Sequence, residues 1–131
     1  MSASTVLKLM KEKEIEYVDL RFTDPRGKLQ HVTMDGKVVD EEMLNVGVYF
    51  DGSSIAGWKA INESDMILKP DLERQVVDPF TSHNTLILFC DVLDAVKKDP
   101  YERDPRSTAK KAEAYLKKSG IGDKANFGPE A

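Results

Sequence analysis

Apolar residues recur with two different periods in the first third of the chain, and each period predicts a different element. One face of a short helix is predicted by Val6, Leu7, Leu9 and Met10. Ser4 can cap the start of this helix. From residue 17 to 23 apolar and polar residues alternate, which is typical of a half-buried strand. The turn sequence at 24–27 then predicts a hairpin whose second strand covers 28–34.

The middle of the chain gives weaker signals. A short helix is predicted over 40–44, with Asp40 as its cap and its end near Gly47. The Gly- and Ser-rich stretch from 47 to 58 has no periodicity that predicts an element. Three further strands are predicted at 65–69, 75–77 and 85–92, the first two bounded by Pro70 and Pro79 and the third apolar on both faces.

The last part of the chain changes character. Charged residues and two prolines over 94–105 predict a connector. A helix follows, with Asp104 as cap, Pro105 at its first position and Gly120 just past its end. Its narrow apolar stripe consists of Ala109, Ala112, Tyr115 and Leu116. A strand is expected to begin at 125–127, so close to the last residue that we expect the sequence to be a piece of a longer chain.

Composition narrows the class of protein. A chain of 131 residues with 40% apolar and 32% charged residues is typical of a soluble globular protein. Its net charge of -4 argues against nucleic-acid binding, because no basic excess is present to neutralise phosphates. The longest apolar run, 86–90, is far too short to cross a bilayer, and the first residues contain no apolar run typical of a signal peptide. We therefore expect a cytoplasmic protein without a membrane partner.

The residues with chemical potential are few. His31 and His83 belong to no spaced metal motif, and we interpret them as strand or loop residues. Cys90 lies in an apolar strand and is interpreted as an inert buried thiol. Neither a phosphate-binding P-loop nor a hydrolase nucleophile elbow is present in the sequence.

Two carboxylates admit two interpretations each. Asp51 precedes Gly52 and two serines, which favours an Asx turn in which the carboxylate accepts hydrogen bonds from the following backbone. The alternative interpretation is a site for a cation or an amine, because a carboxylate in a partly dehydrated cleft attracts positive charge strongly. Glu130, near the end of the chain, is either a solvated residue or a ligand for a hard metal ion.

Seven short strings identify a family resemblance that covers nearly the whole chain. They are YVDLRFTD (17–24), FDGSSI (50–55), GW (57–58), NESDM (62–66), DPF (78–80), DPR (104–106) and FGPE (127–130). In this order and spacing they resemble the bacterial type I glutamine synthetases. The resemblance implies an α+β fold in which residues 1–103 form a β-grasp, ubiquitin-like N-terminal domain. Residues 104–131 would be the truncated start of the catalytic domain, a helix and a first strand.

The same resemblance implies an activity. In this family ATP phosphorylates glutamate, and ammonia then displaces phosphate from γ-glutamyl phosphate to give glutamine. Two divalent ions, Mg2+ or Mn2+, serve the phosphoryl transfer. The substrates are glutamate, ammonium and ATP, and the enzyme is a homo-oligomer of two stacked hexameric rings, with each active site shared between neighbouring subunits.

The resemblance also assigns roles to individual residues. Asp51 matches the aspartate that binds ammonium and helps to deprotonate it, and Ser54 matches a serine near the same pocket. Glu130 matches the first glutamate of the metal-binding strand. Trp58 lies in a loop that approaches the neighbouring subunit's nucleotide region, although burial of a lone tryptophan explains it equally well. Ala131 stands where many members have proline, and the family's remaining metal ligands match no position of this sequence.

Two other functions stay open. The chain could be a free-standing β-grasp interaction module, or part of a related ligase that joins glutamate to a different amine. Because one carboxylate cannot hold a pair of metal ions, we expect the 131 residues alone to form no glutamine.

Overall fold

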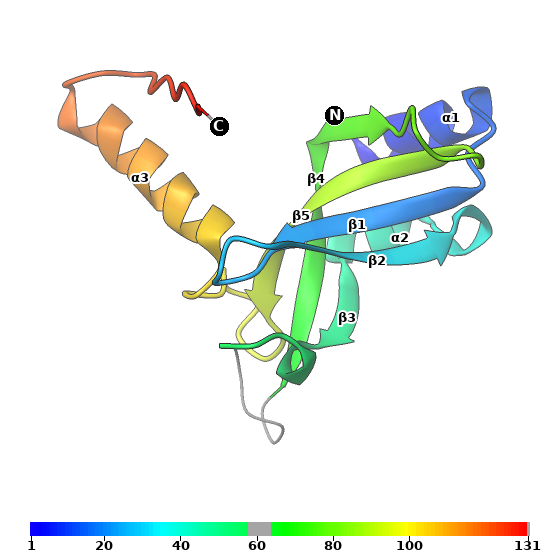
Figure 1. The fold of residues 1–131 in the computed structure, drawn as a ribbon, viewed down its shortest axis with the longest axis horizontal. Helices are drawn as coiled ribbons and strands as arrows, with labels where there is room; N and C mark the ends of the chain where they lie inside the picture. Colours follow the sequence, from blue (N-terminus) through cyan, green and yellow to red (C-terminus); the bar gives the residue numbers. More distant parts are fainter. Residues whose placement is uncertain (58–63, 131) are drawn as a thin grey trace.

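The computed structural model describes residues 1–57 and 64–130, and its centre is a mixed five-stranded sheet (Figure 1). The strands lie in the order β2-β1-β5-β4-β3. β1 and β5 pair in parallel, and the other neighbours pair antiparallel. Strand bounds are β1 Tyr17–Thr23, β2 Leu29–Asp35, β3 Val48–Asp51, β4 Asp65–Val77 and β5 Thr85–Asp94. Helix bounds are α1 Ala3–Glu12, α2 Glu41–Val46 and α3 Pro105–Ser119, with short 3-10 turns η1 Gly36–Val38 and η2 Gly52–Ser54.

The core lies between one face of the sheet and the helices α1 and α2. Alternation along β1 places Val18, Leu20 and Phe22 in this core, as the sequence predicts. The matching residues of β5 are Leu86, Leu88, Cys90 and Val92. Since β5 is the central strand, both of its faces are covered along much of its length, and its apolar character follows.

Helix ends agree with the prediction in two cases and differ in one. Asp40 caps α2, and Asp104 caps α3 with Pro105 at its first position. Gly47 and Gly120 end these helices with positive φ angles of 100° and 71°. The predicted cap of α1 is wrong: Ser2, not Ser4, accepts the N–H of Thr5. The helix begins earlier because its buried face starts at Ala3.

Two features of the sheet differ from the sequence prediction. The predicted strands at 65–69 and 75–77 are parts of a single strand, β4, in which Pro70 pairs with Cys90. Proline is tolerated here because the register shifts between Pro70 and Gln75, where the regular ladder is interrupted. The second difference is β3, which arises in the stretch without periodicity and adds an edge strand along β4.

The C-terminal part departs most from the expectation. Residues 125–127 form no strand, because no neighbouring strand in the described part of the chain pairs with them, and Phe127 is 90% exposed. α3 projects from the sheet, as Figure 1 shows, and most of its apolar stripe is exposed, including Tyr115. The predicted division into residues 1–103 and 104–131 stays a prediction.

Candidate functional site

Asp51 is the last residue of β3, at the edge of the sheet. Within β3 the side chains alternate, so Val48 and Phe50 are partly buried against the core while Tyr49 and Asp51 are exposed. Phe50 packs against Phe22 of β1 with 5.3 Å between the ring centroids. This packing fixes the direction of β3 and therefore points Asp51 away from the core.

Hydrogen bonds hold the carboxylate of Asp51. Its Oδ1 accepts the backbone N–H of Ser53 at 2.9 Å and caps the 3-10 turn η2, which is the Asx turn that the sequence favours. The Ser53 side chain and backbone, and the hydroxyl of Ser64, lower the pKa of Asp51. Among the residues that the structure describes, no Lys, Arg or His forms an ion pair with Asp51. The site is thus an ionised carboxylate on an ordered turn.

The Asx turn alone does not identify a functional site, because the chain contains a second one of the same kind. Asp35 also precedes a glycine, caps the 3-10 turn η1 and accepts the N–H of Lys37 at 2.9 Å. What sets Asp51 apart is the pair of serine hydroxyls near its carboxylate. Asp35 therefore serves as a matched control.

Gly52 is needed where the chain leaves β3. It is buried, and its N–H donates to the carbonyl oxygen of Ser64 at 2.8 Å. A Cβ atom at this position would overlap the Met66 thioether and would lie 3.0 Å from the Ser64 carbonyl oxygen. The backbone can pack this closely on β4 only because residue 52 has no side chain.

The rest of the turn is held at Ile55 and Gly57. Ile55 packs against the core, and its N–H donates to the Gly52 carbonyl oxygen at 3.1 Å. The carbonyl oxygen of Gly57 accepts a hydrogen bond from Arg103 at 3.0 Å. Ser54 is exposed at the end of the same turn, three residues after Asp51. Trp58 lies outside the described residues.

Glu130 is not brought to this turn. It is exposed in an irregular segment, and Figure 1 shows the C-terminal end well apart from the end of β3. In the described ranges 1–57 and 64–130, no three His, Cys, Asp or Glu side chains cluster so as to hold a metal ion. These residues therefore do not form a metal site by themselves, and a role for Glu130 requires ligands from elsewhere.

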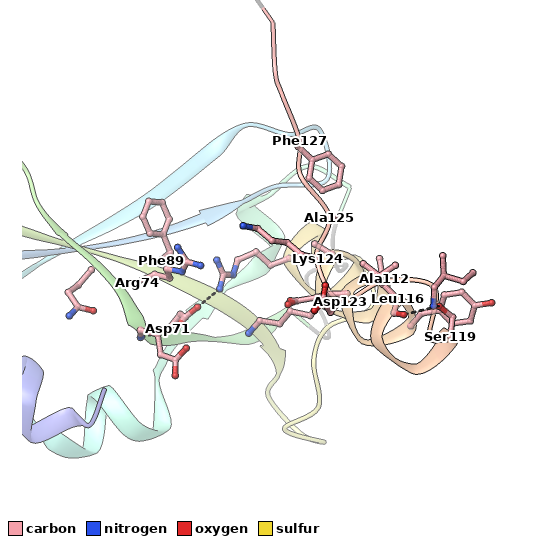
Figure 2. A pocket seen from close by; sticks show the side chains of 18 of the residues that line it. Asp71, Arg74, Phe89, Ala112, Leu116, Ser119, Asp123, Lys124, Ala125 and Phe127 are labelled. Carbon is pink, nitrogen blue, oxygen red and sulfur yellow. Dashed lines mark hydrogen bonds and ion pairs between the residues drawn. The ribbon is translucent and has the colours of Figure 1, made fainter.

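A groove lies between α3 and the sheet face opposite α1 and α2, and Figure 2 shows the side chains that line it. Phe89, Leu116 and Phe127 contribute apolar surface, and Asp71 and Lys124 contribute charge. Asp51, Ser54 and Glu130 are not among its lining residues. The groove is consequently a separate feature from the predicted site.

Ion pairs attach the first turn of α3 to the sheet at one end of this groove. Arg106 donates to Asp71 at 2.6 Å and to Asp91 at 2.9 Å, and Lys110 also pairs with Asp91. Asp104, which is 1% exposed, accepts the N–H of Val92 at 3.2 Å. Burial raises the pKa of Asp104, against the effect of its backbone hydrogen bonds. The start of α3 is therefore fixed to β4 and β5.

The sequence did not predict a polar cluster on the sheet face opposite α1 and α2, the face that also lines the groove. Asp19, only 4% exposed, accepts hydrogen bonds from Arg21 Nε at 2.7 Å, His31 Nδ1 at 2.7 Å and Thr33 Oγ1 at 2.9 Å. Burial acts to raise the pKa of Asp19, but these hydrogen bonds outweigh it, and the pKa is lowered. Arg21 also pairs with Asp78 at 3.3 Å. The opposite charges two residues apart in β1 were the available signal.

The positions predicted for the two histidines and the burial predicted for the cysteine agree with the structure. His31 lies in β2 and His83 in the loop before β5, where it contacts Glu16 at 3.2 Å. Cys90 is fully buried, and burial raises the pKa of its thiol. In residues 1–57 and 64–130, no helix combines the length and apolar character that a membrane span requires.

Comparisons with known proteins identify the relatives of this chain. Residues 14–95 match the family model described as the β-grasp domain of glutamine synthetase, which confirms the predicted fold. The chain is 64% identical over 130 residues to glutamine synthetase of Rhizobium meliloti (strain 1021) and 54% identical over 130 residues to that of Escherichia coli (strain K12). These matches cover 99% of this chain and 28% of each relative.

A solved structure gives the same result for the fold. A cryo-EM structure of Plasmodium falciparum glutamine synthetase superposes with a TM-score of 0.82 at 23% identity, over 92% of this chain and 23% of that one. The chain thus spans about 28% of the length of the curated relatives that it matches.

Proposed function

The chain belongs to the glutamine synthetase family, and from this premise we propose that it supplies the ammonium-binding carboxylate, Asp51, to an active site shared between subunits. The parent protein is a glutamate–ammonia ligase that forms glutamine from glutamate, ammonium and ATP through γ-glutamyl phosphate. Its subunits form two stacked hexameric rings in the cytoplasm. The single observation that carries the proposal is the exposed, ionised carboxylate of Asp51, held on an ordered turn at the sheet edge.

The strength of a charge interaction shows why a second subunit is required. Two unit charges 4 Å apart attract each other by about 1 kcal/mol in water, but by about 4 kcal/mol at the effective dielectric constant near a protein surface. Asp51 is exposed in the chain alone. Ammonium binding at useful affinity therefore requires a neighbouring protein surface that covers Asp51 and excludes water.

The chemistry of ammonia transfer suits a carboxylate at this position. Ammonium is not nucleophilic until it loses a proton, so an anion that binds the cation and accepts its proton prepares it for attack on an acyl phosphate. The lowered pKa keeps Asp51 ionised at neutral pH, ready to bind a cation. Ser54, exposed in the same turn, is close enough in sequence to contribute a hydroxyl to the amine pocket.

The proposal assigns the phosphoryl-transfer machinery mainly to other parts of the parent protein. Glu130 would provide one carboxylate ligand to Mg2+ or Mn2+, which would neutralise nucleotide phosphates. Because the described residues do not form a metal site, the other ligands would come from outside the described residues. Trp58, outside the described residues, would approach the nucleotide region of the neighbouring subunit.

The test uses the full-length enzyme with Asp51→Asn. The amide keeps an oxygen that accepts the Ser53 N–H, so the turn is retained and only the charge is lost. We expect the KM for ammonium to rise by about tenfold or more while the KM for ATP changes less than about twofold. Asp35→Asn, at the matched Asx turn of η1, should change neither value.

Equal ammonium dependence in the Asp51→Asn and wild-type enzymes would contradict the proposal. The same assay with methylamine in place of ammonium tests the alternative function, a ligase that joins glutamate to another amine. Faster turnover with methylamine than with ammonium would favour that alternative. The 131-residue chain by itself is expected to form no glutamine from glutamate, ammonium and ATP. Measurable turnover by this chain would contradict the shared site.

A further inference from the structure

Two cationic side chains extend from the segment after β5 toward β3 and its following turn. Lys98 contacts the Tyr49 hydroxyl, and its Nζ lies 4.6 Å from the Tyr49 ring centroid. Arg103 Nη1 donates to the Gly57 carbonyl oxygen at 3.0 Å. Tyr49 lies two residues before Asp51 and on the same exposed side of β3, and Gly57 ends the turn that follows Asp51. The two contacts thus bracket the proposed ammonium site.

The backbone around Arg103 is fixed on β5. Tyr101, a core residue that is 8% exposed, donates its N–H to the Val92 carbonyl oxygen at 2.8 Å. Asp104 accepts the Val92 N–H, and the Asp104 N–H donates to the Tyr101 carbonyl oxygen at 3.1 Å. Arg103 therefore lies between two anchored residues, and its guanidinium group extends from a rigid base. A donor held in this way loses little conformational freedom when it binds the Gly57 carbonyl group.

The turn needs such a contact at its far end. Its start is fixed by Gly52, which packs on Met66 and donates to Ser64, and its middle by Ile55 against the core. Gly57 has a φ angle of 89°, a conformation that glycine adopts easily and that provides little stiffness by itself. The hydrogen bond from Arg103, two residues before α3, holds the Gly57 carbonyl oxygen at this end of the turn.

We propose that Arg103 is a positioning residue for the ammonium site: its hydrogen bond to Gly57 holds the turn at 52–57, and with it the carboxylate of Asp51, in the orientation that faces a neighbouring subunit. Arg103 acts through the turn and does not contact substrate. Because Arg103 immediately precedes the Asp104 cap of α3, it also connects the orientation of α3 to the site. This inference rests on the proposed function.

The test compares Arg103→Ala and Arg103→Lys in the full-length enzyme, with Arg74→Ala as the matched control. Arg74 is an exposed arginine of β4 for which the described residues provide no ion-pair partner. In Arg103→Ala we expect the KM for ammonium to rise by about three- to tenfold, as loss of one charged hydrogen bond allows. The KM for ATP and the thermal midpoint should stay near the wild-type values, because Arg103 is exposed. Arg103→Lys should recover part of the loss, and Arg74→Ala should show none.

Hydrogen–deuterium exchange provides a readout that is independent of turnover. Peptides covering 48–57 should exchange faster in Arg103→Ala than in the wild-type and Arg74→Ala enzymes, because the turn opens more often. Unchanged exchange in these peptides would overturn the inference, as would an equal rise in the KM values for ammonium and ATP. If the wild-type enzyme forms no glutamine, the proposed function fails, and the exchange rates alone then decide whether Arg103 holds the turn.

Discussion

Replacement of Gly52 by alanine tests whether the site turn depends on close packing against β4. The new Cβ would overlap the Met66 thioether, lie 2.9 Å from Met66 Cγ and lie 3.0 Å from the Ser64 carbonyl oxygen. Met66 is fully buried, so its side chain has little room to move, and the carbonyl group belongs to the backbone of the neighbouring segment. Overpacking of this kind costs about 1–3 kcal/mol.

The measurement is urea unfolding of the 131-residue chain, followed by far-ultraviolet circular dichroism. The expected loss of about 1–3 kcal/mol in the free energy of unfolding is equivalent to a fall of about 4–11 °C in the thermal midpoint of a chain of this length. Gly128→Ala is the matched control, because a Cβ at Gly128 meets no atom of the described structure within 4 Å and the φ angle of Gly128 is not positive. Its unfolding free energy should stay within about 0.5 kcal/mol of the wild-type value.

A double-mutant cycle with Met66→Ala identifies the contact. Met66→Ala itself costs about 2–5 kcal/mol because it leaves a cavity, but it also removes the thioether that the new methyl group would meet. Gly52→Ala should therefore cost less in the Met66→Ala background, with a coupling of about 0.5–3 kcal/mol. Strict additivity of the two changes, or a Gly52→Ala variant as stable as Gly128→Ala, would refute the reasoning.

Two further predictions concern the outer face of the sheet. Asp19→Asn should lower the free energy of unfolding by about 1–3 kcal/mol, because Arg21 and His31 lose their charged partner. The carboxylate of Asp19 is buried, whereas the side chains of Arg21 and His31 are partly exposed. Because the folded pKa of Asp19 is lowered, its contribution is present above the unfolded value near 3.9 and is lost as the pH falls through the folded pKa. Urea midpoints between pH 3 and 7 should thus converge for wild type and Asp19→Asn toward acid, and a constant difference would exclude this linkage. Arg106→Met should remove the ion pairs of Arg106 with Asp71 and Asp91, lower the free energy of unfolding by about 1 kcal/mol and speed hydrogen exchange in α3. Unchanged exchange would show that Asp104 and Lys110 are enough to fix the helix.

Local sequence patterns, such as alternation, turn residues and helix caps, were enough to predict most helices and strands. The hairpin β1–β2 follows from alternation and a turn sequence, and α3 follows from Asp104, Pro105 and Gly120 at its ends. Three breaks from prediction in the sheet, Pro70 within β4, the added edge strand β3 and the absence of a strand at 125–127, all depend on neighbouring strands. Strand pairing depends on residues that are distant in the sequence, so the periodicity of one segment cannot predict it.

The candidate site divides in the same way. Asp51 and Ser54 were predicted from their strings, and the Asx turn at Asp51 from the following Gly52 and Ser53. The role of Arg103 could not be predicted, because 46 residues separate it from Gly57 and only the fold brings the two together. The Asp19 cluster likewise joins three elements, β1, β2 and the loop before β5.

The parallel pairing of β1 with β5 sets the order in which a ribosome-bound chain can complete this domain. β1 can join β2 as a hairpin soon after synthesis, but its other edge must wait for residues 85–89. At about 5–20 residues per second, the roughly 60 residues between the end of β1 and the start of β5 take about 3–12 s to be synthesised. During that interval the edge of β1 that will pair with β5 is unpaired, and the apolar face of the hairpin is uncovered. Nascent chains paused before β5 should therefore aggregate or bind chaperones most readily.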